Sequence, residues 1–231
     1  MTRKTAVFDL DGTLIHTAPD LLDALNHSLA SDGLAAVSQS GFGRALGSGG
    51  KAMIETAHRK QNRELTPEAL ERLYRLFLQH YSDNIPGKSQ PYPGVLDALD
   101  RFDAAGYRLA ICTNKTEAMA HKLIEGLGLR QRFGAICGVD TFMHCKPDPR
   151  HLLETIEMVS GDPSLSLMIG DSRTDIDTAK AAGIPVVAVD FGYTDEHVRA
   201  FEPSVIISHY DELTIHLADR LIAAGNGVGR P

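Results

Sequence analysis

Hydrophobic and polar positions along the chain follow a regular alternation from about residue 90 onward. Short apolar runs alternate with stretches in which apolar residues recur every three or four positions. The runs predict strands, and the stretches predict helices, several of them closed by a glycine. We therefore expect strands at 108–112, 135–138, 166–169, 186–189 and 205–207, helices at 94–105, 117–127, 149–158 and 175–182, a final helix, and a frayed tail at 225–231. This order is typical of βαβ units, so the expected fold class is α/β, with a Rossmann-like parallel sheet covered by helices on both faces.

Residues 15–82 interrupt this alternation, because they carry helical patterns only. Thr66 and Pro67 supply a capping hydroxyl and a first-turn proline for the last of these helices. We interpret 15–82 as an all-helical cap domain inserted after the first strand, and 1–14 with 83–231 as the core. The cap would cover the carboxyl end of the first strand, where open α/β sheets bind ligands.

Composition narrows the class of protein. The 231 residues are 43% hydrophobic and 23% charged, which is ordinary for a globular chain. A net charge of −7 without a basic block argues against a nucleic-acid partner. No apolar run approaches membrane-spanning length, no signal peptide opens the chain, and three cysteines suit reduced thiols. We expect a cytoplasmic monomer or homodimer with no membrane partner.

The first apolar run ends in two carboxylates, Asp9 and Asp11. In extended geometry both point to the same side, where they repel each other unless a cation or a proton intervenes. Gly12 permits a sharp turn, and Thr13 adds a hydroxyl there. The alternative is a strand that simply ends in a polar turn.

Two later apolar runs also end in polar residues. One ends in Thr113 and Asn114, which offer a hydroxyl and backbone N–H groups where phosphate oxygens could dock. The other ends in Asp171, and Asp175 follows four residues later at the start of a helix. For Thr113 and Asn114 the alternative is capping of the next helix, and the same alternative holds for Asp175.

Four segments in order resemble the motifs of the haloacid dehalogenase-like phosphohydrolases, and they span residues 8–175. The segments around 15–21, 46–50 and 170–173 are similar to the phosphoglycolate phosphatase-like subgroup. The four segments are Phe8-Asp9-Leu10-Asp11-Gly12-Thr13-Leu14, Thr113-Asn114, Lys146-Pro147-Asp148-Pro149 and Gly170-Asp171-Ser172-Arg173-Thr174-Asp175.

The chemistry of phosphate esters fits these residues. Asp9 suits a nucleophile that forms an aspartyl-phosphate, and Asp11 suits the acid that protonates the leaving oxygen and later deprotonates water. Lys146, kept out of helical geometry by Pro147, can pair with Asp9 and with phosphoryl oxygens, although a solvated surface lysine is the alternative.

The resemblance implies the same catalytic roles and adds a Mg²⁺ cofactor. It assigns the metal to the side chains of Asp9 and Asp171 and to the backbone carbonyl of Asp11, and we expect Asp175 to support that site from behind. The expected phosphate-binding residues are Thr13, Thr113, Asn114 and Lys146.

A glycine-rich loop at 41–51 supplies the expected substrate-reading residues of the cap. Its candidates are Arg44, Lys51 and the backbone amides around Gly47 and Gly49, which could bind a substrate carboxylate. The alternative is a flexible hinge with two solvated basic residues. The favoured activity is hydrolysis of 2-phosphoglycolate. The alternatives are a sister phosphatase of a sugar phosphate or pyrophosphate, a phosphomutase, and a catalytically silent regulatory or binding module.

Overall fold

The structure is a computed structural model that describes residues 3–42, 46–47, 49–194 and 196–227. Its core is a six-stranded sheet in the order β5-β4-β1-β6-β7-β8, and every neighbouring pair is parallel. The fold class predicted from the sequence is thereby confirmed. The strands are β1 (Arg3–Phe8), β4 (Arg108–Cys112), β5 (Ala135–Cys137), β6 (Gly161–Gly170), β7 (Val186–Val189) and β8 (Val205–Ile207).

Helices cover both faces of this sheet. Alternate residues of β1 separate the two faces: Ala6 and Phe8 pack in one apolar cluster and Val7 in the other. The first cluster includes residues of α5 (Val95–Ala104), α6 (Glu117–Gly126) and α9 (Ile215–Gly227), and the second those of α7 (Pro149–Met158) and α8 (Arg173–Ala182).

Two boundaries differ from the prediction. Strand β6 starts at Gly161 rather than 166, because its polar first half pairs with the start of β1 without an apolar run to signal it. Helix α9 continues to Gly227, so the frayed tail predicted from residue 225 begins too early.

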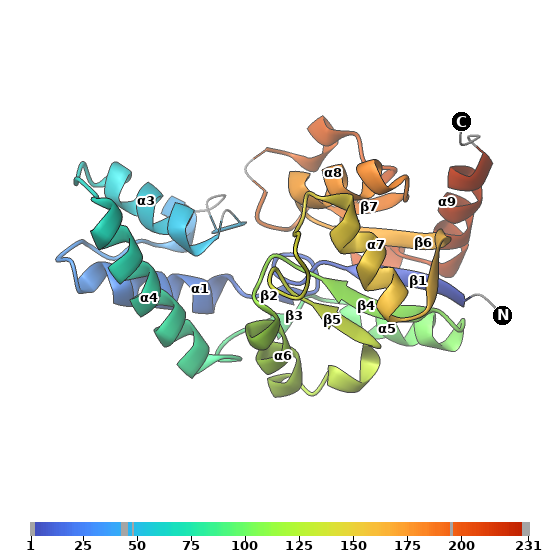
Figure 1. Cartoon of the computed structure of the whole chain (residues 1–231), viewed down its shortest axis with the longest axis horizontal. Helices are drawn as coiled ribbons and strands as arrows, with labels where there is room; N and C mark the ends of the chain where they lie inside the picture. Colours follow the sequence, from blue (N-terminus) through green and yellow to red (C-terminus); the bar gives the residue numbers. More distant parts are fainter. Residues whose placement is uncertain (1–2, 43–45, 48, 195, 228–231) are drawn as a thin grey trace.

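A second, helical lobe lies beside the sheet and forms the left half of Figure 1. It contains α1 (Ala18–Ala30), α2 (Gln39–Phe42), α3 (Gly50–Lys60) and α4 (Pro67–Asn84). Helix α4 begins as predicted, because the Thr66 hydroxyl accepts a hydrogen bond from the Ala69 amide at 3.2 Å. We call these four helices the cap.

The chain enters and leaves the cap through a short antiparallel ribbon. It consists of β2 (Ile15–His16) and β3 (Gln90–Pro91), two-residue strands too short to be recognised in the sequence. Beside it, the buried carboxylate of Asp20 accepts hydrogen bonds from the amides of Lys88 and Ser89 and from the Ser89 hydroxyl. Because this ribbon belongs to neither lobe, the predicted boundaries of the cap at 15 and 82 stay a prediction. Within the described residues, no helix is both long and apolar enough to span a bilayer.

Candidate active site

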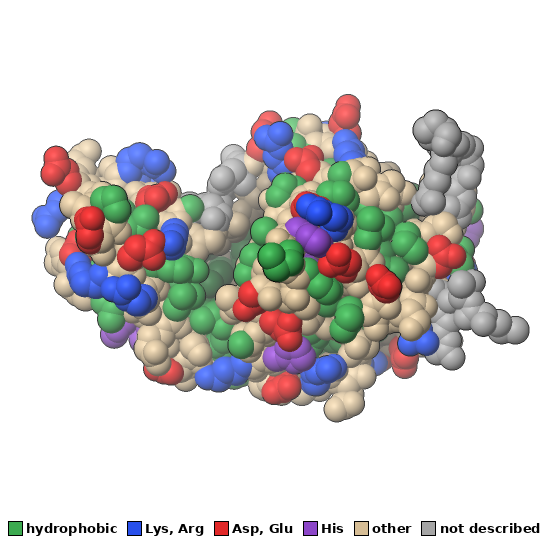
Figure 2. Space-filling view, viewed as in Figure 1, with side chains coloured by type: hydrophobic (Ala, Val, Ile, Leu, Met, Phe, Trp, Pro, Cys, Tyr) green, Lys and Arg blue, Asp and Glu red, His purple; other side chains and the backbone are tan. Residues whose placement is uncertain are grey.

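The carboxyl ends of three neighbouring strands meet at the edge of the sheet that faces the cap. Asp9 follows β1, Thr113 follows β4 and Asp171 follows β6. A cavity of about 380 Å³ lies between this edge and the cap, and the space-filling view is hollowed between the two lobes (Figure 2). The three polar strand ends named from the sequence therefore lie together at one edge of the sheet.

Three buried carboxylates form an acidic cluster at this edge. Oxygens of Asp9, Asp171 and Asp175 lie within 4.8 Å of one another. Burial raises the pKa of Asp9 to about 6, and the neighbouring Asp175 adds to the effect of burial while Lys146 opposes it. Burial, together with the charges of Asp9 and Asp175, also raises the pKa of Asp171 well above its ordinary value. The fold thus keeps three carboxylates close together although their negative charges repel one another, as expected of a site that binds a cation.

Lys146 balances part of this charge. Its Nζ donates to Asp9 Oδ1 at 2.7 Å and to Asp175 Oδ1 at 2.5 Å. Burial alone would lower the pKa of Lys146, but the carboxylates of Asp175 and Asp9 outweigh it and raise this pKa, so the ammonium stays charged. One ammonium among three carboxylates leaves an excess of negative charge on hard oxygen ligands, and a divalent cation such as Mg²⁺ fits such a set.

Asp171 is held by both of its oxygens. The Thr13 hydroxyl donates to Oδ1 at 2.8 Å, and the Tyr193 amide donates to Oδ2 at 2.7 Å. Gly12 and Gly192 permit this approach, because a Cβ on Gly12 would lie 2.5 Å from Asp171 Oδ2 and one on Gly192 would lie 2.2 Å from Asp171 Cβ. Thr13, expected at the phosphate, thus lies behind Asp171, and its role in binding phosphate stays a prediction.

Asp175 takes the capping role that was the alternative for it, and its support of a metal site stays a prediction. Its Oδ2 accepts from the amide and the hydroxyl of Ser172, which completes a capping box at the start of α8. Its Oδ1 accepts from Lys146. Asp175 therefore caps the start of α8 and holds the Lys146 ammonium at the same time.

The loop after β4 brings Thr113 and Asn114 to the cavity wall. The Thr113 hydroxyl accepts from the Lys115 amide at 3.2 Å, and the Asn114 side chain donates to the Lys146 carbonyl at 3.0 Å. Asn114 thereby joins the loop after β4 to the loop that carries Lys146.

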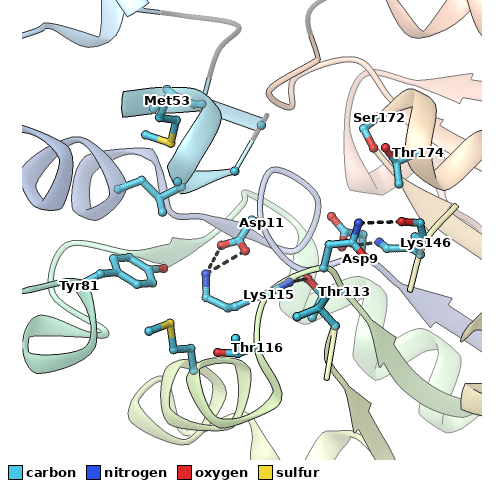
Figure 3. A pocket seen from close by; sticks show the side chains of 18 of the residues that line it. Asp9, Asp11, Met53, Tyr81, Thr113, Lys115, Thr116, Lys146, Ser172 and Thr174 are labelled. Atoms are coloured by element: carbon cyan, nitrogen blue, oxygen red, sulfur yellow. Dashed lines mark hydrogen bonds and ion pairs between the residues drawn. The ribbon is translucent and has the colours of Figure 1, made fainter. Parts of the chain in front are cut away.

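Lys115 is a cavity residue that the sequence analysis missed. Its Nζ donates to both carboxylate oxygens of Asp11 at 2.9 Å and lies 4.5 Å from the ring centre of Tyr81 in cap helix α4 (Figure 3). The side chain is only 6% exposed. Burial would lower the pKa of Lys115, but Asp11 and Tyr81 together raise it above its usual range. Its position directly after Thr113 and Asn114 was the available signal.

The cap residues expected to bind the substrate carboxylate differ in their distance from the cavity. Gly47 and Gly49 line the cavity. Lys51 is half-exposed, pairs with Glu71 and lies 5.2 Å from the Tyr74 ring centre within the cap. Arg44 lies outside the described residues.

Known proteins resemble this chain over nearly its whole length. Residues 6–189 match the family model described as haloacid dehalogenase-like hydrolase. The chain is 65% identical to a phosphoglycolate phosphatase of Mesorhizobium japonicum, with 97% of this chain and 99% of the relative covered. It is 45% identical to a phosphoglycolate phosphatase of Agrobacterium fabrum, with 95% and 94% covered. A crystal structure of a predicted phosphoglycolate phosphatase from Haemophilus somnus superposes with a TM-score of 0.84 at 28% identity, covering 92% and 97%.

Proposed function

The chain belongs to the haloacid dehalogenase-like hydrolase family and is a phosphatase of that family, and on this premise we propose that it hydrolyses 2-phosphoglycolate to glycolate and phosphate with the help of Mg²⁺. One observation carries the proposed chemistry: Asp9, at the end of β1, is paired with the Lys146 ammonium and clustered with the carboxylates of Asp171 and Asp175. The names of the two relatives from Mesorhizobium japonicum and Agrobacterium fabrum support 2-phosphoglycolate as the substrate.

The proposed reaction runs in two steps through Asp9. In the first, an Asp9 oxygen bonds to phosphorus while the bond from phosphorus to the leaving oxygen breaks, and Asp11 passes a proton to that oxygen. In the second, Asp11 takes a proton from water as the water oxygen bonds to phosphorus. The bond from Asp9 to phosphorus then breaks, and phosphate and the free carboxylate are restored.

The residues around Asp9 prepare it for this attack. Lys146 holds one Asp9 oxygen at 2.7 Å and balances negative charge on the transferring group. The loop of Thr113 and Asn114 supplies N–H and hydroxyl groups for phosphate oxygens at the cavity wall. Asp11 is the neighbouring carboxylate that exchanges the proton.

Asp9 and Asp171 would hold the Mg²⁺, which when bound supplies positive charge that lets two anions approach each other. The acidic cluster and its raised pKa values support this assignment. The hydrogen bonds from Thr13 and Tyr193 fix the orientation of Asp171 for such a role.

Replacing Asp171 by alanine is expected to raise the Mg²⁺ concentration for half-maximal activity on the order of 100-fold. Asp175→Ala should raise it far less, because Asp175 acts through Lys146 and the helix cap. Titration of activity with Mg²⁺ for both variants measures the difference. A larger increase in this Mg²⁺ concentration for Asp175→Ala than for Asp171→Ala would assign the metal ligand to Asp175 instead of Asp171.

A panel of phosphorylated metabolites tests the substrate. We expect kcat/KM for 2-phosphoglycolate to exceed the values for sugar phosphates and pyrophosphate by at least a factor of about 100. Turnover should disappear with EDTA and return with Mg²⁺. A preference for a sugar phosphate or pyrophosphate would replace the proposed substrate and leave the proposed chemistry intact.

A further inference from the structure

The pairing of Lys115 with Asp11 occupies the residue that must exchange the proton. An ammonium only donates hydrogen bonds, so both Asp11 oxygens act as acceptors in this arrangement, each at 2.9 Å from Nζ. Neither oxygen is then available to donate a proton to a leaving group. Catalysis therefore requires that Asp11 and Lys115 separate.

The surroundings of Lys115 suit a second anion. The Tyr81 ring covers the ammonium, and the Tyr81 hydroxyl is buried and has no hydrogen-bond partner in the part of the chain that the structure describes. Figure 3 shows this hydroxyl turned toward Asp11 and Lys115. Burial raises the pKa of Tyr81 to about 12, so the hydroxyl keeps its proton and can donate it in a hydrogen bond. An unused donor next to a buried ammonium indicates that an acceptor is missing here.

Part of the cavity wall is apolar, and apolar surroundings strengthen a charge pairing. Met53, Phe77 and Leu78 of the cap and Met119 of α6 line the cavity beside Tyr81. In such surroundings an ion pair is less screened than in water. Lys115 and Tyr81 together offer two donors, which match the two oxygens of one carboxylate.

The proposed substrate carries its carboxylate next to its leaving oxygen. In 2-phosphoglycolate a single carbon atom separates the leaving oxygen from the carboxylate carbon. The group that binds the carboxylate must therefore lie next to the group that protonates the leaving oxygen. Lys115 and Asp11 are in direct contact and meet this requirement.

We propose that Lys115 and Tyr81 bind the carboxylate of the substrate, and that this carboxylate displaces Asp11 from Lys115. The released Asp11 carboxylate can then take up a proton from solvent and pass it to the leaving oxygen. The inference rests on the proposed function and adds how the substrate is recognised. It couples recognition to catalysis, because a phosphate ester without a carboxylate leaves Asp11 bound to Lys115. It also gives the substrate-reading role to a core loop and a cap helix rather than to the glycine-rich loop.

Lys115→Met and Tyr81→Phe test the site with two substrates. Ethyl phosphate resembles 2-phosphoglycolate in size but has no carboxylate. The wild-type enzyme should prefer 2-phosphoglycolate by about 100-fold or more in kcat/KM, Lys115→Met should reduce this ratio to below about 5, and Tyr81→Phe should reduce it several-fold. Lys180→Met, an exposed lysine paired with Glu202 at the far end of α8, is the matched control and should keep the wild-type ratio. Circular dichroism and thermal unfolding confirm that each variant is folded.

The substrate cut into two pieces provides a direct test of the coupling. Methyl phosphate and formate together are 2-phosphoglycolate divided at its carbon–carbon bond. Formate should accelerate hydrolysis of methyl phosphate by the wild-type enzyme at least 5-fold, whereas equal chloride should not, and Lys115→Met should lose the acceleration.

The results of these experiments test the carboxylate site and the proposed substrate separately. If Lys115→Met slows both esters by the same factor and formate has no effect on the wild-type enzyme, Lys115 only positions Asp11 and the inference is wrong. If formate accelerates the wild-type enzyme but the metabolite panel prefers another carboxylate-bearing phosphate, the carboxylate site stands and the proposed substrate is wrong.

Discussion

Asp9→Asn is expected to lower turnover of 2-phosphoglycolate on the order of 10⁵-fold or more, which leaves only background activity. Asparagine has nearly the shape of aspartate and can still accept the hydrogen bond from Lys146, but it cannot form an aspartyl-phosphate. Single-turnover assays with purified variant at micromolar concentration measure the loss. Substantial remaining activity would assign the nucleophile to another residue.

The same variant is expected to be at least as stable as the wild-type protein in the absence of Mg²⁺. The pKa of Asp9 rises from 3.8 to about 6 on folding, so the folded protein binds this proton more tightly than the unfolded chain. Protonated Asp9 therefore contributes to the free energy of unfolding in full below about pH 4, and this contribution is lost as the pH rises toward 6. Thermal unfolding between pH 4 and 7 in EDTA should show a smaller decline for Asp9→Asn. An equal decline in both proteins would contradict the raised pKa.

Lys146→Met carries the second large expected effect, because it removes the cation that pairs with two carboxylates of the acidic cluster. Activity should fall about 10³-fold, since both Asp9 and the transferring group lose their balancing charge. The free energy of unfolding should fall by about 3–5 kcal/mol, because buried carboxylates are left unpaired. Denaturant unfolding in EDTA measures this loss, and Mg²⁺ should recover part of it.

Lys180→Met is the matched control for this effect. Lys180 pairs with Glu202 and donates to the Phe201 carbonyl at an exposed position. The free energy of unfolding of Lys180→Met should therefore differ from that of the wild-type protein by less than about 0.5 kcal/mol. Equal unfolding free energies for Lys146→Met and the wild-type protein would mean that the acidic cluster is already neutralised by protons.

The sheet could be predicted from the sequence because its strands are buried on both faces. Short continuous apolar runs such as 108–112 and 186–189 predict buried strands, and glycines mark the ends of several helices. The first half of β6 escaped prediction because the pairing that makes it a strand comes from β1. The two-residue strands of the ribbon carry no periodicity at all.

The candidate site was predictable to the extent that its residues end strands. Asp9 and Asp171 follow apolar runs, and parallel strands bring such ends to one edge of the sheet. The partner of each residue was not predictable. That Thr13 holds Asp171 depends on a contact across 158 positions in the sequence, and that Lys115 holds Asp11 depends on one across 104.

Lys115 shows why a lysine in a loop is difficult to interpret from sequence. Most lysines in such positions are solvated, and apart from the preceding Thr113 and Asn114 nothing in the local sequence marks this one as buried. Here the cap supplies the difference, because Tyr81 reaches over the ammonium from a separate lobe. The same dependence on the cap applies to Lys51, whose partner Glu71 lies on the neighbouring cap helix α4 and is not part of the cavity lining.

The ribbon and Asp20 limit the ways in which the cap can be placed over the core. Two independent linkers would let the cap take many orientations, and fixing one of them on substrate binding would cost conformational entropy. Here the two crossings are tied to each other by strand pairing and by the hydrogen bonds that Asp20 accepts from Lys88 and Ser89, so neither can move independently of the other. The cap then has fewer orientations to search before it reaches the one in which Tyr81 lies over Lys115.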